Sequence, residues 1–389
     1  MYEVIDYVLK NQLEQLESKT PNDCTYIGFI SDDDLDWIDG VNAALMFGRV
    51  KYERNEETHF WKPLMLKLTP QVINFPEFHV YTFINEAYFF TRVLPYLEKL
   101  KPIQPLFPKF LTSYVEMGVS DDKYLLVFDS LKPEKYHRSP KRGFLDLDHL
   151  KIMMKKLGQF HAFSYEAAKK NRDEFISLAA SFKDVHFTSI RRMQGFLTHL
   201  SARGLESLRK DEKYSSKLEK LEVIIENADS FVNDVFCGEV ENPLSVLCHG
   251  FYIEENVLFQ YENGKPINMK FVDLTSTKLA SPIVDLASTL YIHTDQKMRD
   301  EHWDELVNEY YLSLKSTFPE AVPSKKDILK EFTTKAVIGY LLASYTVCRT
   351  ISEDQNMTHF ADMLPHEYRG FGYSDIPQDI MISLSLIHI

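Results

Sequence analysis

The segment "NVLFQYENGKPINMKFVDL", residues 256–274, decides most about how this chain folds. Two apolar runs flank Asn263-Gly264. This dipeptide is the strongest short hairpin signal, because both central residues of a type I′ turn need a positive φ. The segment therefore predicts two antiparallel strands joined by a two-residue turn.

The same hairpin brings two oxygen-bearing side chains together. With Asn263 and Gly264 as the loop, Asn256 lies opposite Phe271, and Asp273 follows two residues later on the same face. Such diagonal neighbours are about 7–8 Å apart. They can share one Mg²⁺, which prefers oxygen ligands. The alternative is that Asn256 caps the strand start and Asp273 ends the strand in a turn.

The regions on either side of residue 131 have different periodicities. The first third contains apolar strands such as "AALMFGRVKYE" and "PLMLKLTP", and a further strand, "YLLVFDSL", covers 124–131. Beyond it the pattern is mostly helical, with Leu150, Met153 and Leu157 on one helix face. We therefore predict an α+β fold of two lobes, 1–130 and 131–389, with a cleft between them.

Two charged residues lie where the pattern predicts burial. Leu64, Leu66 and Leu68 alternate along one strand face and leave Lys67 on the other. A lysine within an apolar strand needs a partner. Glu86 falls on the apolar stripe of the helix expected from about residue 83 to 99, and could be that partner. Taken singly, the two could also be a snorkelling lysine and a stripe-edge glutamate.

Bulk composition excludes several classes of protein. The net charge of −13 argues against a nucleic-acid binder, which needs a basic surface. The four cysteines have no zinc-binding spacing, and no apolar run approaches the roughly 20 residues that span a bilayer. The first residues are acidic and amphipathic, unlike a signal peptide. We expect a cytoplasmic protein; its oligomeric state is not indicated.

Several segments, in order, resemble those of the insect ecdysteroid-kinase-like family, which is related to choline kinases and aminoglycoside phosphotransferases. The shared segments cover most of the chain: "DGVNAALMFGRVKY", the Lys67 strand, "INEAYFF", "YLLVFDSL", "LGQFHAFS", "LCHG" with Asn256, "FVDLTS" and "SPIVDLASTL". The resemblance implies a bilobal protein-kinase-like fold with an ATP site between the lobes. It also implies transfer of phosphate to a small hydroxylated acceptor, with ATP and Mg²⁺ as cofactors.

The resemblance also implies a role for individual residues. Lys67 would contact phosphate and pair with Glu86, and Asp285 and His249 would brace the catalytic loop. His161 is expected to pack in the large lobe. The remaining implied positions are the nucleotide loop at Gly40 and Asn42, the adenine-binding hinge at Phe128, Asp129 and Leu131, and the Mg²⁺ ligands Asn256 and Asp273.

One residue departs from the family pattern at the catalytic position. Phe251 stands where the loop would carry the aspartate that accepts the acceptor's proton. General-base catalysis contributes about 10²–10⁴-fold, so its loss slows transfer without necessarily abolishing it. Glu254 and Glu255 are possible substitutes, or else solvated loop charges. Two functions stay open: a phosphotransferase for a steroid or xenobiotic acceptor, and a pseudokinase that binds nucleotide or ligand.

Overall fold

A computed structural model describes residues 2–16, 24–32, 44–68, 76–116, 123–141, 143–185, 195–209, 215–237 and 241–354. The chain divides into two compact units. The first comprises Met1–His137 and Lys270–Thr275, and the second comprises Arg138–Met269 and Ser276–Ile389. Within the described residues, no helix is both long and apolar enough to cross a membrane.

The first unit contains an antiparallel sheet and the helices that pack with it. Its elements are α1 (Tyr2–Leu16), β1 (Cys24–Ser31), β2 (Ala44–Arg54), β3 (Glu57–Phe60), β4 (Leu64–Leu68), α2 (Pro76–Tyr88), a π-helical turn (Phe89–Val93), α3 (Leu94–Glu98), β5 (Phe110–Glu116), β6 (Lys123–Asp129) and β7 (Tyr136–His137). The strand order is β1-β2-β4-β6-β5, with β3 beside β2.

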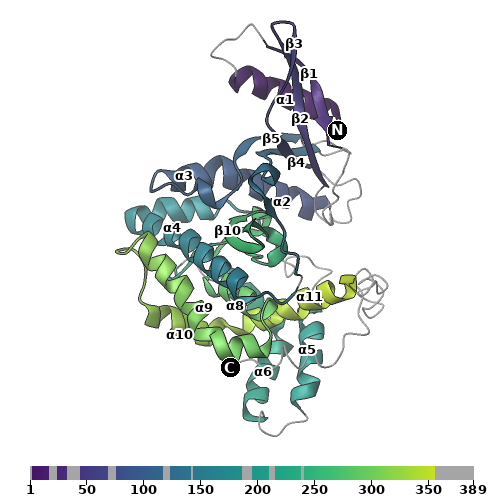
Figure 1. Ribbon diagram of the computed structural model, residues 1–389. Coiled ribbons are helices and arrows are strands. Elements are labelled where there is room, and N and C mark those ends of the chain that lie inside the picture. The colour runs from purple at the N-terminus through teal and green to yellow at the C-terminus, as the bar shows by residue number, and fades with distance from the viewer. Residues whose placement is uncertain are drawn as a thin grey trace. The chain divides into compact units, whose positions relative to one another are not determined.

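Helix α1 closes one side of this sheet (Figure 1). Its buried residues Ile5, Val8 and Leu9 join a core with alternate residues of β4. Asp6 lies beside them, and its Oδ1 accepts from the backbone N–H of Phe29 at 3.3 Å. That contact occupies a donor of edge strand β1, and covered donors are how proteins protect sheet edges from further pairing.

The second unit is mostly helical. Its elements are α4 (Leu147–Ala179), α5 (Phe196–Leu208), α6 (Ser215–Glu226), α7 (Ala228–Cys237), β8 (Val246–Cys248), β9 (Val257–Glu262), β10 (Lys265–Phe271), β11 (Lys278–Ala280), α8 (Ile283–Ile292), α9 (Gln296–Thr317), α10 (Lys325–Lys335) and α11 (Val337–Asp354). Helices α4 and α9 run side by side, and α8 packs against α11 (Figure 1).

The predicted hairpin is confirmed. Strands β9 and β10 are neighbours in one sheet, and only Asn263 and Gly264 separate them. Both turn residues have positive φ, 51° and 77°, as a type I′ turn requires. The last residues of β10 belong to the first unit, so this hairpin strand links the two units covalently.

Candidate functional site

Lys67 lies on a central strand of the first unit. Strand β4 pairs with β2 on one side and β6 on the other, so Lys67 is flanked by Leu45 and Leu126. The residue is 9% exposed. Its Nζ lies 2.6 Å from Glu86 Oε2 and 2.8 Å from Asp273 Oδ1. The expected lysine–glutamate pair is therefore present, together with a second carboxylate.

Glu86 faces inward from α2, as the apolar stripe predicted. It is 2% exposed, and its Oε1 accepts from the backbone N–H of Leu274 at 3.3 Å. The neighbouring Asn85 donates from Nδ2 to the carbonyl of Thr275 at 2.9 Å. Helix α2 thus holds the segment that follows Asp273 through two side chains, and a π-helical turn begins three residues after Glu86.

The charges in this cluster determine its protonation. Burial alone lowers the pKa of Lys67, but Asp273 and Glu86 outweigh it and raise the pKa above the ordinary lysine value. Burial pushes the pKa of Glu86 upward, and Lys67 opposes that rise. Lys67 is therefore a buried cation at neutral pH. Because a buried charge needs compensation, removing one partner alone would leave the other uncompensated in this core.

Asp273 has an unusual backbone for a residue with a side chain. Its φ is 61°, in the left-handed region that aspartate tolerates better than most residues. Its side chain is 32% exposed, unlike that of Glu86. Such outliers persist only where surrounding contacts hold them, and they are common at functional sites. The contacts here are the ion pair of Asp273 with Lys67 and the hydrogen bond from Leu274 to Glu86.

The second unit holds the segment that resembles a catalytic loop. Asp285, fully buried on α8, accepts from two successive loop N–H groups: His249 at 2.7 Å and Gly250 at 3.0 Å. Asp285 therefore braces the loop, as the resemblance implied. His249 takes part through its backbone N–H.

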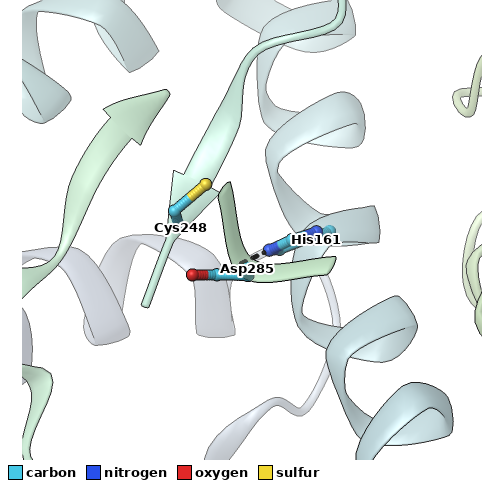
Figure 2. Close-up of side chains that lie close together, drawn as sticks. All are labelled: His161, Cys248 and Asp285. Carbon is cyan, nitrogen blue, oxygen red and sulfur yellow. Dashed lines mark hydrogen bonds and ion pairs between the residues drawn. The ribbon is translucent and has the colours of Figure 1, made fainter. Parts of the chain in front are cut away.

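His161 packs in the second unit, as expected, and contacts the same carboxylate. Its Nε2 lies 3.1 Å from Asp285 Oδ2, and its Nδ1 lies 2.9 Å from the hydroxyl of Tyr310 on α9. Figure 2 shows the imidazole directed at Asp285, with the thiol of Cys248 nearby. The ligand atoms of these three buried residues lie within 4.8 Å of one another.

Sulfur, nitrogen and oxygen donors of this kind can hold a metal ion, but each is already engaged. The two oxygens of Asp285 accept from two backbone N–H groups and contact His161, and the Sγ of Cys248 donates to the carbonyl of Ser281 at 3.2 Å. A metal would have to break these bonds. The cluster therefore acts as a hydrogen-bonded brace.

Gly250 is required by the loop geometry. Its φ is 86°, and a Cβ at this position would lie 2.0 Å from the carbonyl oxygen of Ser276. Only glycine fits such a backbone without moving its neighbour. The residue before Phe251 therefore keeps the conformation that the loop needs.

Phe251 sits in a loop whose backbone is held on both sides. Its carbonyl accepts from Asn256 Nδ2 at 3.0 Å and from the N–H of Ile253 at 3.1 Å. The next carbonyl, of Tyr252, accepts from Thr289 Oγ1 at 3.4 Å. The Phe251 side chain contributes to none of these bonds. The amide of Asn256 uses its donor on the loop, so its Oδ1 is the atom that can serve as a ligand.

The two possible substitute carboxylates lie on the turn Glu254–Asn256. Glu254 is 4% exposed, which contradicts the expectation of a solvated loop charge, while Glu255 is half-buried. The backbone N–H of Glu254 donates to His293 Nε2 at 3.0 Å. Glu254, Glu255 and His293 line a hollow of about 10 Å³, room for a single water molecule.

The remaining predicted site residues are the nucleotide loop, the hinge and the pair of Mg²⁺ ligands. Gly40 and Asn42 lie outside the described residues. In the hinge, Phe128 is buried against Phe90, and Asp129 pairs with Lys62 at 2.5 Å. Asn256 belongs to the second unit and Asp273 to the first, so the metal pair stays a prediction.

Three residues that hold loop backbones in place were not predicted from the sequence. Asn85, Thr289 and His293 each hold a loop backbone through one side-chain atom. Asn85 could have been found as a polar residue inside an apolar helix, next to Glu86. For the other two no local pattern exists, because their partners are more than thirty residues away.

The sequence matches the model of one known protein family. The model of the ecdysteroid kinase-like family matches residues 42–321, and the chain belongs to that family. The observed division into a unit with a β-sheet and a helical unit is that of the protein-kinase-like fold, as predicted. The matched range contains Lys67, Glu86, Asp273, Asp285 and the loop with Phe251.

Solved structures similar to the chain are distant. A microcompartment-associated aminopropanol kinase is 11% identical, with a TM-score of 0.43 and coverage of 97% of this chain and 94% of that one. The AMP-bound complex of a spectinomycin phosphotransferase is 11% identical, with a TM-score of 0.38 and coverage of 88% of this chain and 91% of that one. Among curated proteins, none matches this sequence.

Proposed function

We propose that this chain is an ATP- and Mg²⁺-dependent O-phosphotransferase for a small hydroxylated acceptor, with a chemical step slowed by Phe251. The observation that supports it is the Lys67–Glu86–Asp273 cluster, in which one ammonium is held by two carboxylates at 2.6 and 2.8 Å. Kinases use such a lysine to bind the phosphates of ATP and such a glutamate to hold it in place.

We propose that Asp273 and Asn256 each offer one oxygen ligand to Mg²⁺. Asp273 has a partly exposed carboxylate, and Asn256 has its Oδ1 available as an oxygen ligand. Both are oxygen donors of the kind that Mg²⁺ takes together with phosphate oxygens. When bound, Mg²⁺ would neutralise charge on the transferred phosphate. The residues of the chain then position the nucleotide and the loop.

Hydrogen bonds hold the loop around residue 251 in place, but the side chain of Phe251 cannot act as a base. Two N–H groups are held by Asp285 and one carbonyl by Asn256, so hydrogen bonds fix the backbone around residue 251. Most of the acceleration in phosphoryl transfer comes from positioning and charge stabilisation. A slow transferase is therefore consistent with the loss of the aspartate. An apolar acceptor, such as a steroid or xenobiotic alcohol, suits the phenyl ring better than a charged one.

A second candidate function is a pseudokinase that binds nucleotide or a small ligand without transfer. Phe251 itself favours it, and so does the burial of Glu254, which keeps that carboxylate from acting as a solvated substitute. Both functions use the Lys67 cluster when the ligand is a nucleotide. They differ only in whether the unmodified protein transfers phosphate.

One experiment separates the two functions. Calorimetry measures Mg·ATP binding, and radiolabel transfer to a sterol panel compares the unmodified protein with Phe251→Asp. For the transferase we expect measurable transfer by the unmodified protein and an increase of about 10²–10⁴-fold in the variant. Transfer by the variant alone would establish the pseudokinase. Absence of ATP binding in both proteins would overturn the transferase and the nucleotide-binding form of the pseudokinase.

Glu254→Gln and Glu255→Gln test the substitute bases directly. If either change abolishes transfer by the unmodified protein, that carboxylate accepts the proton. We expect little change for Glu254→Gln, because its buried side chain lines the small hollow beside His293.

A further inference from the structure

The start of helix α4 contains a hydrogen-bonded series that the proposed phosphotransfer does not use. Asp146 is the N-cap of α4, and its Oδ1 accepts from the backbone N–H of His149 at 3.2 Å. The same oxygen lies 2.6 Å from His149 Nδ1. A carboxylate only accepts hydrogen bonds, so Nδ1 carries a proton, and in the neutral imidazole Nε2 then carries the lone pair.

That lone pair meets a hydroxyl from another element. Tyr261 on β9 places its phenolic oxygen 2.8 Å from His149 Nε2. The phenol therefore donates its proton toward the imidazole. The hydroxyl of Ser139 is also hydrogen-bonded to Tyr261. All four residues belong to the second unit.

The charges around the series set the role of each member. Burial opposes ionisation of Asp146, but hydrogen bonds from His149 and Lys141 lower its pKa to about 2, so it is a carboxylate at neutral pH. Burial, Asp146 and Glu254 raise the pKa of Tyr261, and Ser139 opposes them. The phenol is thus neutral and needs a base to become nucleophilic.

A hydroxyl in contact with an imidazole that a carboxylate orients is the arrangement of an activated nucleophile. We propose that Asp146, His149 and Tyr261 form such a site, and that Tyr261 accepts an acyl group from an activated ester. His149 is 5% exposed on its side chain, whereas Asp146 is 40% exposed and Tyr261 half-buried. The imidazole of His149 is shielded, and Tyr261 as a whole is only partly buried.

The step balances without a further reactant. The Tyr261 oxygen attacks the ester carbonyl carbon while His149 Nε2 takes the phenol proton. The new bond joins the tyrosine oxygen to the acyl carbon, and the bond between that carbon and the leaving oxygen breaks. The imidazolium then gives its proton to the departing alkoxide or aryloxide. The products are an O-acyl tyrosine and the alcohol or phenol that corresponds to the leaving group.

The probe for this site is p-nitrophenyl acetate, applied to the full chain, with intact mass and peptide mapping as readouts. We expect one acetyl group on Tyr261 and none after Tyr261→Phe, which keeps the ring and removes only the hydroxyl. His149→Gln should slow acetylation at least about 10-fold, because it removes the base. Asp146→Asn keeps a good N-cap and should slow acetylation less.

A matched control lies within the same molecule. The hydroxyl of Tyr26 is 2.5 Å from Asp6, so its hydrogen-bond partner is a carboxylate rather than an imidazole. It should stay unmodified under conditions that acetylate Tyr261. Equal labelling of Tyr26 and Tyr261, an unchanged rate in His149→Gln, or no adduct on Tyr261 would each overturn the proposal. Thermal unfolding of each variant confirms that the second unit is folded.

Discussion

The Lys67 cluster of the first unit and the Phe251 loop of the second unit are held in place in different ways. In the cluster, the charged side chains themselves are present and paired at 2.6 and 2.8 Å. In the loop, the hydrogen bonds run to the backbone, and the side chain of Phe251 takes part in none of them.

The difference follows from what holds each region. A buried ammonium needs its carboxylates, so losing one leaves an uncompensated charge. The loop is held by groups that contact its main chain, namely Asp285, Asn256 and Thr289. Its shape therefore does not depend on the identity of residue 251. Under the proposed function, nucleotide binding and phosphoryl transfer therefore depend on separate regions of the chain.

The largest effect should come from breaking the cluster. Lys67→Met leaves Glu86 and Asp273 facing each other without a cation, and breaking a buried pair costs about 3–5 kcal/mol of stability. Chemical unfolding followed by a probe in the first unit measures the loss. Nucleotide affinity should fall at least about 10-fold by calorimetry, since a charged contact is worth about 1.5–3 kcal/mol.

Lys62→Met is the matched control for that change. Lys62 also pairs with an aspartate, Asp129, but its side chain is 36% exposed. Exposed pairs contribute about 0–1 kcal/mol. If both substitutions cost the same, burial is not what makes the Lys67 pair essential.

The second-largest loss of stability should come from removing Asp285, which braces the loop. Asp285→Ala leaves two buried backbone N–H groups without their acceptor, at about 1–3 kcal/mol each. Asp285→Asn keeps the volume and one acceptor oxygen, and should cost less. Thermal unfolding of the second unit measures both. An unchanged melting temperature in Asp285→Ala would show that the loop is held by other contacts.

His293, which accepts a hydrogen bond from the backbone of Glu254 in the loop, should make stability depend on pH. Burial lowers the pKa of His293 from 6.5 to about 4, against smaller opposing effects of Gly143 and Glu255. Between these values the unfolded state binds a proton that the folded state does not, so stability falls as pH drops from about 6.5 to 4. The loss is at most about 1.4 kcal/mol per pH unit, or about 3 kcal/mol in total.

Melting curves of the second unit between pH 4.5 and 7 test this dependence, because Asp146 titrates mainly below that range. His293→Gln carries an amide that does not titrate, so this part of the pH dependence should disappear in the variant. An unchanged slope would assign it to other groups.

The smallest expected effect is at the hairpin turn that joins the two regions covalently. Gly264 has a φ of 77° and open space around its Cβ position, so Gly264→Ala should cost about 1–2 kcal/mol through backbone conformation alone. Gly28→Ala is the control, because it also meets open space but has no left-handed φ. Equal melting temperatures for the two variants would contradict the turn assignment.

Local patterns were enough to predict several features. The turn at Asn263-Gly264, the burial of Lys67 and the inward face of Glu86 each follow from the period of a strand or helix around them. The helix with Glu86 begins at Pro76, earlier than the expected start near residue 83, because the apolar stripe marks only its buried face. Periodicity locates faces more reliably than ends.

By itself, the sequence determined the family and the lysine–glutamate pair, because each depends on residue identity at a fixed place in a local pattern. The tertiary structure alone decided which groups hold the loop and where Glu254 lies. Asp285, Thr289 and His293 reach the loop from α8 and the residue after it, more than thirty residues away. Contacts at that separation depend on chain packing, which no local period encodes.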